Sequence, residues 1–415
     1  MTAREITQTL AIILAAGLVS ELVAGIVRLP RMVVLLAVGA ILGPSVTDAV
    51  DVPLDNVGIE LLLTLGVSFI LFYGGLGLSA TVLSRVAVGL GMLAVPGVVL
   101  TCVVTGAVAA WAFGLPFENG LLIGAVLAPT DPAILIPLFE RLEIRPKVSQ
   151  TIVAESALND PTGAALALTL AAFVVDGGSL GTPLVDFLEA VTLSTLIGVA
   201  IGLVLAILIS DRRIGVWSET PAIAVMLIVA AGYFTIDSVG GSGYLGAFIA
   251  GAIVGNIDML GLRMIPAREQ LLEGFVGILA DVVVIFVFVV LGANLPFESF
   301  PEHAPAALAT VAALILVARP LTVMLCLGLD RRGRWTRAEA IFLTWSRETG
   351  VVPAAVAALL VAQGTTIGDE LTTTVAVAII VTLVVQSTTK RWLAERLGLV
   401  ERPAPAGAVG TVDNV

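Results

Sequence analysis

Charged residues are scarce in this sequence. Asp, Glu, Lys and Arg make up 13% of the 415 residues, whereas 58% are hydrophobic and the mean hydropathy is +1.07. Such a chain is too apolar for a soluble domain and long enough for a dozen or more membrane spans. The net charge of -11 argues against nucleic acid as a partner. We therefore predict an all-α polytopic membrane protein, with lipid as its surroundings.

Histidine and cysteine are also rare, with one and two residues. The sequence has no Ser/His pairing and no His-Glu-x-x-His motif, so it does not indicate an enzyme. His303 is expected in a solvated outer loop, which argues against a histidine pH sensor. Cys102 and Cys326 lie in apolar runs, where small buried side chains are expected rather than a disulfide. Without a P-loop, the chain is predicted to bind no nucleotide and no cofactor, so any pumping must use a second ion gradient.

Hydrophobic runs of about 20 residues, cut at Pro, Gly and charge clusters, divide the chain into thirteen predicted transmembrane helices. They lie near residues 6–27, 32–45, 56–78, 86–113, 118–140, 148–175, 184–209, 219–237, 240–257, 270–292, 304–328, 338–362 and 371–396. Residues 1–400 are expected to form one transmembrane unit. The small and polar residues 401–415 predict a disordered cytoplasmic tail.

Apart from Arg4 on the outer side and Arg319 and Arg347 within spans, the basic residues lie in alternate connections or at the C-terminal end. The basic connections carry Arg28 and Arg31, Arg85, Arg141 to Lys147, Arg212 and Arg213, Arg263 and Arg268, Arg331 to Arg337, and Lys390 to Arg402. The intervening connections are acidic and contain no Lys or Arg. Because cytoplasmic loops are enriched in Lys and Arg, the alternation predicts an outer N-terminus and a cytoplasmic C-terminus in the cell (inner) membrane.

The fifth predicted span is interrupted at Thr130-Asp131-Pro132. Proline removes a backbone donor and clashes with the preceding turn, so we expect the helix to break there. Asp131 is then placed to cap the second half-helix, and the Thr130 carbonyl becomes available as a ligand. An ionised side chain near the bilayer centre costs at least ~2.5–3.5 kcal/mol, which favours a functional carboxylate. The alternative is a capping Asp in a kinked helix that binds no ion.

The sixth span carries a second polar interruption. Glu155 and Asn159 share one helical face, and Ser156 and Asp160 share the adjacent face. Pro161 cannot donate to the preceding turn, which leaves a further carbonyl oxygen near Asp160. Carboxylate, hydroxyl and carbonyl oxygens suit a hard cation such as Na⁺ or Li⁺. The alternative is a set of buried polar residues that only join helices.

The twelfth span is interrupted at Ser346-Arg347-Glu348-Thr349-Gly350. Discontinuous helices at corresponding positions of two halves indicate an inverted-repeat transporter. A buried guanidinium needs a carboxylate, and Glu155 and Glu348 are both candidates for Arg347.

Two further charges in the late spans are not assigned. Arg319 lies nearer the cytoplasmic end of the eleventh span, where it either snorkels to the interface or joins the polar cluster. Asp281 in the tenth span is a second site element, a partner of Arg319, or a neighbour of a cavity. The sequence leaves these alternatives open.

Together these motifs resemble the NhaP-type branch of the monovalent cation/proton antiporters. The resemblance is carried by Thr-Asp-Pro, by Glu-Ser-x-x-Asn-Asp in the next span, by Arg-x-x-Gly late in the chain, and by the early segments 29–44 and 71–76. It implies a homodimer with thirteen spans and two discontinuous helices that cross. It also implies a mobile core bundle, about 86–175 and 304–396, which moves against a dimerisation part, about 6–78 and 184–292.

The resemblance also implies roles for single residues. Asp160 would be the carboxylate for which cation and proton compete, assisted by Asp131, the Thr130 carbonyl and Ser156. Glu155 is a further candidate ion ligand and, with Asn159 and Arg347, would form the supporting polar cluster, with Glu348 and Arg319 beside it. Two residues depart from the family pattern: Pro161 follows Asn-Asp, and Glu348 follows Arg347.

An exchange mechanism follows from the chemistry of a desolvated aspartate. Its pKa is raised, so at the site it holds either a proton or a cation, and the two compete. The Asn159-Asp160 pair has a single titrating carboxylate, which predicts electroneutral one-for-one exchange of Na⁺ or Li⁺ for a proton. The alternatives are a potassium/proton antiporter and a cation channel, which would use the same carboxylates without alternating access.

Overall fold

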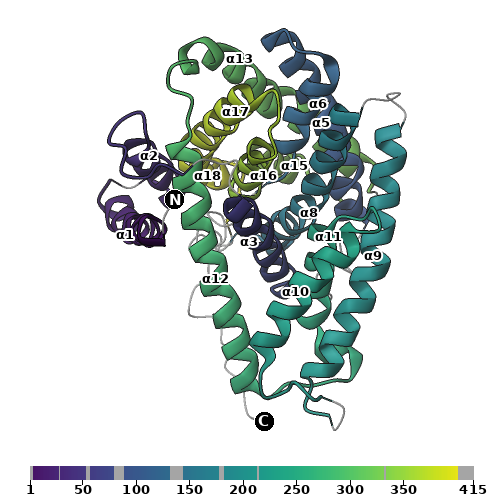
Figure 1. Ribbon diagram of the computed structural model, residues 1–415. Helices are drawn as coiled ribbons and strands as arrows, with labels where there is room; N and C mark the ends of the chain where they lie inside the picture. The colour runs from purple at the N-terminus through teal and green to yellow at the C-terminus, as the bar shows by residue number, and fades with distance from the viewer. Residues whose placement is uncertain are drawn as a thin grey trace, which may run out of the picture.

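A computed structural model shows an all-helical molecule. It describes residues 3–27, 29–52, 57–78, 88–130, 144–176, 182–212, 215–330 and 333–400. Within these ranges the β-structure is limited to one isolated bridge between Ile144 and Val400. The predicted all-α class is therefore confirmed (Figure 1).

The helices follow one another along the whole chain. The first half contains α1 (Ala3–Val27), α2 (Arg31–Leu42), α3 (Val57–Leu76), α5 (Pro96–Phe113), α6 (Phe117–Val126), α8 (Pro146–Asp176) and α9 (Thr182–Ile209). The second half contains α10 (Pro221–Asp237), α11 (Gly243–Val254), a 3₁₀ turn (Ile257–Leu260), α12 (Pro266–Ala293), α13 (Phe300–Ala313), α14 (Arg319–Leu329), α15 (Arg337–Trp345), α16 (Val351–Ala362), α17 (Gly368–Val381) and α18 (Ser387–Arg396). Two π-helical turns, η2 (Leu314–Ala318) and η3 (Thr382–Gln386), join α13 to α14 and α17 to α18.

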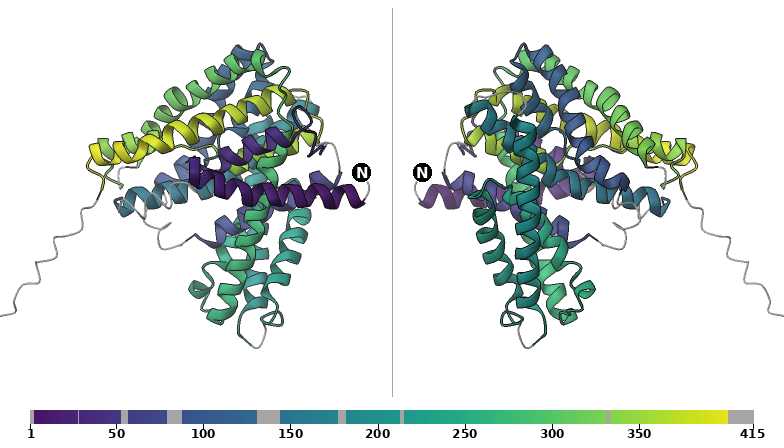
Figure 2. Two further views of the ribbon diagram at one scale, coloured as in Figure 1. Left: turned by 90° about the vertical axis from the view of Figure 1, so that its left-hand side faces the viewer. Right: turned by 90° about the vertical axis from the view of Figure 1, so that its right-hand side faces the viewer.

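Eight helical segments are long and apolar enough to cross a membrane, and five shorter apolar helices accompany them among the described residues. Each of the thirteen predicted ranges contains helical residues, while the number of crossings stays a prediction. The free end of α1 and the end of α18 lie on opposite sides of the molecule (Figure 2). Which side is cytoplasmic also stays a prediction.

Glycines allow several helix pairs to approach at backbone distance. A Cβ atom on Gly251 of α11 would overlap the carbonyl oxygen of Phe72 in α3, and one on Gly255 would overlap that of Leu76. Gly39 of α2 lies in the same way against Val289 of α12. Close approach of this kind is how membrane helices gain packing energy without a hydrophobic driving force. These small-residue positions therefore pack within the chain.

The site is built on the helices of the broad upper part of Figure 1, where α5, α6, α13, α16 and α17 lie together. Helices α9, α10 and α12 extend into the narrow lower part. Gly124 of α6 packs on the backbone of Cys102 in α5, which fixes the helix that ends at the site. The division into a mobile core and a dimerisation part stays a prediction.

The structure corrects one sequence expectation and confirms another. His303 lies in the first turns of α13 rather than in a solvated loop, and its ring is half-buried with its centroid 5.9 Å from that of Phe113. The helix begins at Phe300, four residues before the predicted span, and so includes the histidine. Cys102 and Cys326 are buried and free, as predicted.

We expect Gly251→Val to destabilise the protein by about 1–3 kcal/mol, because a side chain there forces α11 away from α3. Thermal unfolding of the detergent-solubilised protein measures the effect as a lower melting temperature. The matched control is Gly274→Ala in α12, where a Cβ meets no atom within 4 Å. Equal melting temperatures for Gly251→Val and the wild type would show that the two helices do not depend on this contact.

Candidate functional site

The first half of the fifth predicted span ends at the expected place. Helix α6 stops at Val126, and the chain continues through Ala128 and Pro129 to Thr130 in non-helical conformation. Gly163 of α8 gives Pro129 the space that a side chain would otherwise fill. Asp131 and the rest of the span lie outside the described residues, so the role of Asp131 stays a prediction.

Three polar side chains meet where α6 ends. Asn159 accepts a hydrogen bond from the Thr130 backbone N–H through Oδ1 (3.1 Å) and donates from Nδ2 to Thr130 Oγ1 (2.9 Å). Thr130 Oγ1 and Ser156 Oγ are 2.8 Å apart and share a further hydrogen bond. All three residues are at least 96% buried. The structure therefore brings together three residues that the sequence predicted for one site.

Asp160 follows directly on the same helix, one turn from Ser156, and is half-buried. Helix α8 runs without interruption from Pro146 to Asp176 despite Pro161. The proline cannot donate to the preceding turn, so the Ala157 carbonyl lacks its usual helical donor. Asp160 thus lies on α8 one turn from the Ser156 hydroxyl, and its role as an ion ligand stays a prediction.

The twelfth predicted span is broken between α15 and α16, as expected. Arg319 approaches this break from α14 and is 2% exposed. Its guanidinium forms a bidentate ion pair with Glu155 and donates to the Leu343 carbonyl (2.9 and 3.1 Å) and the Ser346 carbonyl (3.5 Å). The alternative that Arg319 snorkels to the interface is therefore wrong, because the Glu155 carboxylate and the carbonyls at the end of α15 hold its guanidinium in the interior.

Arg347 is held by main-chain oxygens. Its Nη2 atom donates to the carbonyls of Leu127 and Ala128 at 2.7 and 2.8 Å, where α6 ends. A cation at a helix C-terminus is favoured by the free carbonyls and by the helix dipole. Glu155 was one of the two candidate partners of Arg347, and this pairing is wrong because Glu155 binds Arg319.

Glu348, the other candidate partner of Arg347, forms an ion pair with Lys390 of α18. Both side chains are at most 1% exposed. Sequence reasoning missed Lys390, because it was counted with the cytoplasmic basic residues after the last span. The available signal was its spacing from Gln386, which gives two polar residues one turn apart inside the predicted 371–396 helix.

Two π-helical turns adjoin this region. The turn η2 directly precedes Arg319, and η3 supplies Thr382, whose Oγ1 accepts a hydrogen bond from the Thr349 N–H (3.0 Å). A π turn inserts a residue and rotates the helix that follows, and such turns often occur at functional sites. Here they set the direction of Arg319 and Lys390 relative to the break.

The remaining sequence candidate, Asp281, lies on an exposed position of α12. Arg319 is occupied by Glu155, so the proposed Asp281–Arg319 contact is wrong.

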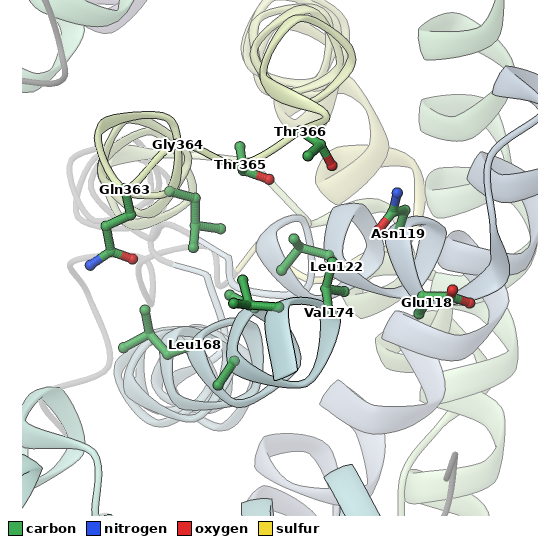
Figure 3. Close-up of a pocket in the computed structure, with 13 residues that line it drawn as sticks. Glu118, Asn119, Leu122, Leu168, Val174, Gln363, Gly364, Thr365 and Thr366 are labelled. Carbon is green, nitrogen blue, oxygen red and sulfur yellow. The ribbon is translucent and has the colours of Figure 1, made fainter. Parts of the chain in front are cut away.

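A pocket of about 730 Å³ opens at the far ends of α6, α8 and α16. Glu118 and Gln363 lie on opposite sides of it, with Leu122 and Leu168 between them (Figure 3). Helix α8 and the segment after α6 also carry the polar cluster, but the pocket and the cluster share no residue. The pocket is therefore separate from the polar cluster and lies at the predicted outer end.

A double-mutant cycle tests the revised pairing. Glu155→Gln and Arg319→Met each leave a buried charge alone, which costs about 3–5 kcal/mol. Because the second mutation removes the charge stranded by the first, the double variant should lose less than the sum, by on the order of 1–3 kcal/mol. Unfolding in mixed detergent micelles measures the coupling. The matched cycle combines Glu155→Gln with Arg347→Met, and a larger coupling there would restore the original pairing.

Comparison with known proteins identifies the family. Residues 10–396 match the family described as sodium/hydrogen exchanger, transmembrane. The chain is 28% identical over 341 residues to the K⁺/H⁺ antiporter NhaP of Alkalimonas amylolytica, covering 81% of this chain and 57% of that protein. It is also 28% identical over 360 residues to the probable Na⁺/H⁺ antiporter 2 of Methanocaldococcus jannaschii, covering 85% and 83%. The chain thus spans little more than half of the first relative and most of the second.

The fold agrees with this match. The structure superposes on that of the sodium proton antiporter MjNhaP1 from Methanocaldococcus jannaschii at pH 8 with a TM-score of 0.82 and 24% identity, covering 95% of this chain and 99% of that one. At this identity the likeness shows the fold alone. Since the family match extends over nearly the whole chain, the protein belongs to the sodium/hydrogen exchanger family.

Proposed function

We propose that the protein is a secondary active transporter that exchanges a monovalent cation for a proton, and that the two ions compete for Asp160. The oxygen cluster of Thr130 and Ser156, with Asp160 one turn along α8, is the observation that carries this proposal. One carboxylate with neutral hydroxyl and carbonyl oxygens suits a hard cation of single charge. No cofactor and no covalent chemistry are needed.

Asn159 serves as a positioning residue in this proposal. Its side-chain amide is engaged on both sides by Thr130, through the backbone N–H and the hydroxyl. These two bonds fix the non-helical segment at the end of α6 against α8. The Thr130 carbonyl and the Ser156 hydroxyl are then the proposed ligands beside Asp160, with Asp131 as an auxiliary ligand.

The ion pairs support Asp160 as the exchanging group. Glu155 and Glu348 each neutralise a buried cation, Arg319 and Lys390 respectively. Protonating either carboxylate would leave that cation unpaired, at a cost of about 3–5 kcal/mol. Glu155, predicted as an ion ligand, therefore becomes a supporting residue. With a single exchanging carboxylate, we propose electroneutral one-for-one exchange.

The placement of the cluster supports alternating access by a moving core. Every described residue of the cluster lies on α8, α14, α15, α18 or the segments that follow α6 and α15. All of these belong to the proposed core bundle, about 86–175 and 304–396, so a rigid displacement would carry the whole site. The remaining part, about 6–78 and 184–292, would stay in place as the interface of a homodimer.

The transported cation is proposed to be Na⁺ or Li⁺, with K⁺ as the alternative. The Methanocaldococcus relative is named a probable Na⁺/H⁺ antiporter and the Alkalimonas relative a K⁺/H⁺ antiporter. All three cations bind oxygen ligands, and cavity size and ligand number distinguish them. Comparing the three in one flux assay decides the substrate.

We expect Asp160→Asn to abolish exchange, because an amide can neither bind a proton nor balance a cation. The measurement is cation-dependent proton flux in proteoliposomes, with Na⁺, Li⁺ and K⁺ compared. The matched control is Asp281→Asn, which removes an exposed carboxylate of α12 and should retain flux. Flux near the wild-type rate in Asp160→Asn would overturn the assignment of Asp160.

A voltage-sensitive dye in the same vesicles separates exchange from a channel. Electroneutral exchange builds no membrane potential, whereas a cation channel does. A potential that accompanies cation entry would therefore contradict one-for-one exchange.

A further inference from the structure

An apolar groove lies on the surface of the membrane-spanning region, outside the polar cluster. It has a volume of about 480 Å³ and is formed by α14, α15 and α18. Its lining includes Met324, Ile341 and Trp392, which are 71%, 51% and 58% exposed. Trp345 Nε1 donates to Thr389 Oγ1 (2.8 Å), so these two polar groups bind each other and leave the groove apolar. Such a groove accepts a hydrocarbon chain.

Arginines stand at one end of both walls of the groove. On α15, Arg337 precedes Ile341 by four residues and so occupies the same helical face one turn nearer the helix start. On α18, Arg396 follows Trp392 by four residues, and its guanidinium lies over the Trp392 ring, 5.3 Å from the centroid. Arg337 and Arg396 are both exposed.

Other contacts hold these two helix ends close together. Lys147 at the start of α8 forms an ion pair with Glu339 in the first turn of α15 (2.9 Å). The neighbouring Arg145 donates from Nη2 to the Gly398 carbonyl just after α18 (3.2 Å). The start of α15 and the end of α18 are thus tied to one point. The basic connections predict that this end of the molecule faces the cytoplasm.

We propose that this groove binds an anionic phospholipid, with an acyl chain between α14, α15 and α18 and the phosphate between Arg337 and Arg396. The apolar walls match the chain, and the paired arginines match the phosphate, which guanidinium groups bind with strong charge-assisted hydrogen bonds. Basic sites between helices at the cytoplasmic side are favoured positions for anionic head groups. A zwitterionic lipid would gain the apolar contact but less of the charge attraction.

The groove adjoins the residues that hold the broken span. Pro320 in its lining follows Arg319 directly, and Trp345 precedes Ser346 at the break. A lipid in the groove would hold α14, α15 and α18 together while the core moves. This effect on transport rests on the proposed function, whereas the binding of lipid does not.

Native mass spectrometry of the purified protein with phosphatidylglycerol tests the binding. We expect one tightly retained phosphatidylglycerol per chain, and roughly thirtyfold weaker retention in Arg337→Gln/Arg396→Gln, on the scale of two arginine contacts with anionic lipid. The control Arg391→Gln removes an exposed arginine from the opposite face of α18, where it pairs with Glu395, and should retain the lipid. Equal retention in all three proteins, or equal retention of phosphatidylcholine by the wild type, would overturn the proposal.

A second variant blocks the groove without removing charge. Ala340→Phe places a ring in the lining, so we expect it to lose the bound lipid while both arginines remain. Retention of the lipid in this variant would show that the head group alone binds, which contradicts the groove as the site. Proton flux in vesicles with and without phosphatidylglycerol then separates the two proposals. If a variant loses the lipid but its proton flux equals that of the wild type in vesicles with and without phosphatidylglycerol, only the proposed effect on transport is contradicted.

Discussion

A helix that ends inside a membrane leaves its last carbonyl groups without donors, and no water is present to bind them. Helices α6 and α15 both end in this way, and in each case an arginine donates hydrogen bonds to the free carbonyl groups. Arg347, in the break after α15, donates to the carbonyls that end α6. Arg319 donates to the carbonyls that end α15. The second discontinuous span therefore supplies the donor that ends the first, and α14 supplies the donor that ends α15.

Buried arginines in turn require compensating charge. Glu155 binds Arg319 from α8, and the Glu348–Lys390 pair adds a second neutral unit beside the break. Because removing one member of such a pair is costly, these carboxylates act as fixed parts of the scaffold. Asp160 is distinguished from them by its position on α8, one turn from Ser156, and by its intermediate burial. Glu155 and Glu348 balance Arg319 and Lys390, whereas Arg347 is held by carbonyl oxygens, and the proposed competition between a cation and a proton then needs one further carboxylate.

The breaks and the polar faces could be predicted from sequence, because proline, glycine and the spacing of four residues act locally. Ser156 and Asn159 lie on adjacent faces of α8, and both bind Thr130 where α6 ends. The partners of the arginines could not be predicted, because three cations and several carboxylates allow many pairings. The π turn before Arg319 also rotates that side chain inward, which hydropathy does not reveal. Lys390 was missed because a lysine near the end of a span normally reaches water.

The central claim is that one cation and one proton compete for a single carboxylate. Calorimetric titration of Na⁺ or K⁺ into the purified protein, repeated in two buffers of different ionisation enthalpy, measures the protons released per cation bound. At a pH where the empty site is protonated, competition for Asp160 predicts a value approaching one. A value near two, or cation binding with no release of protons, would contradict the claim.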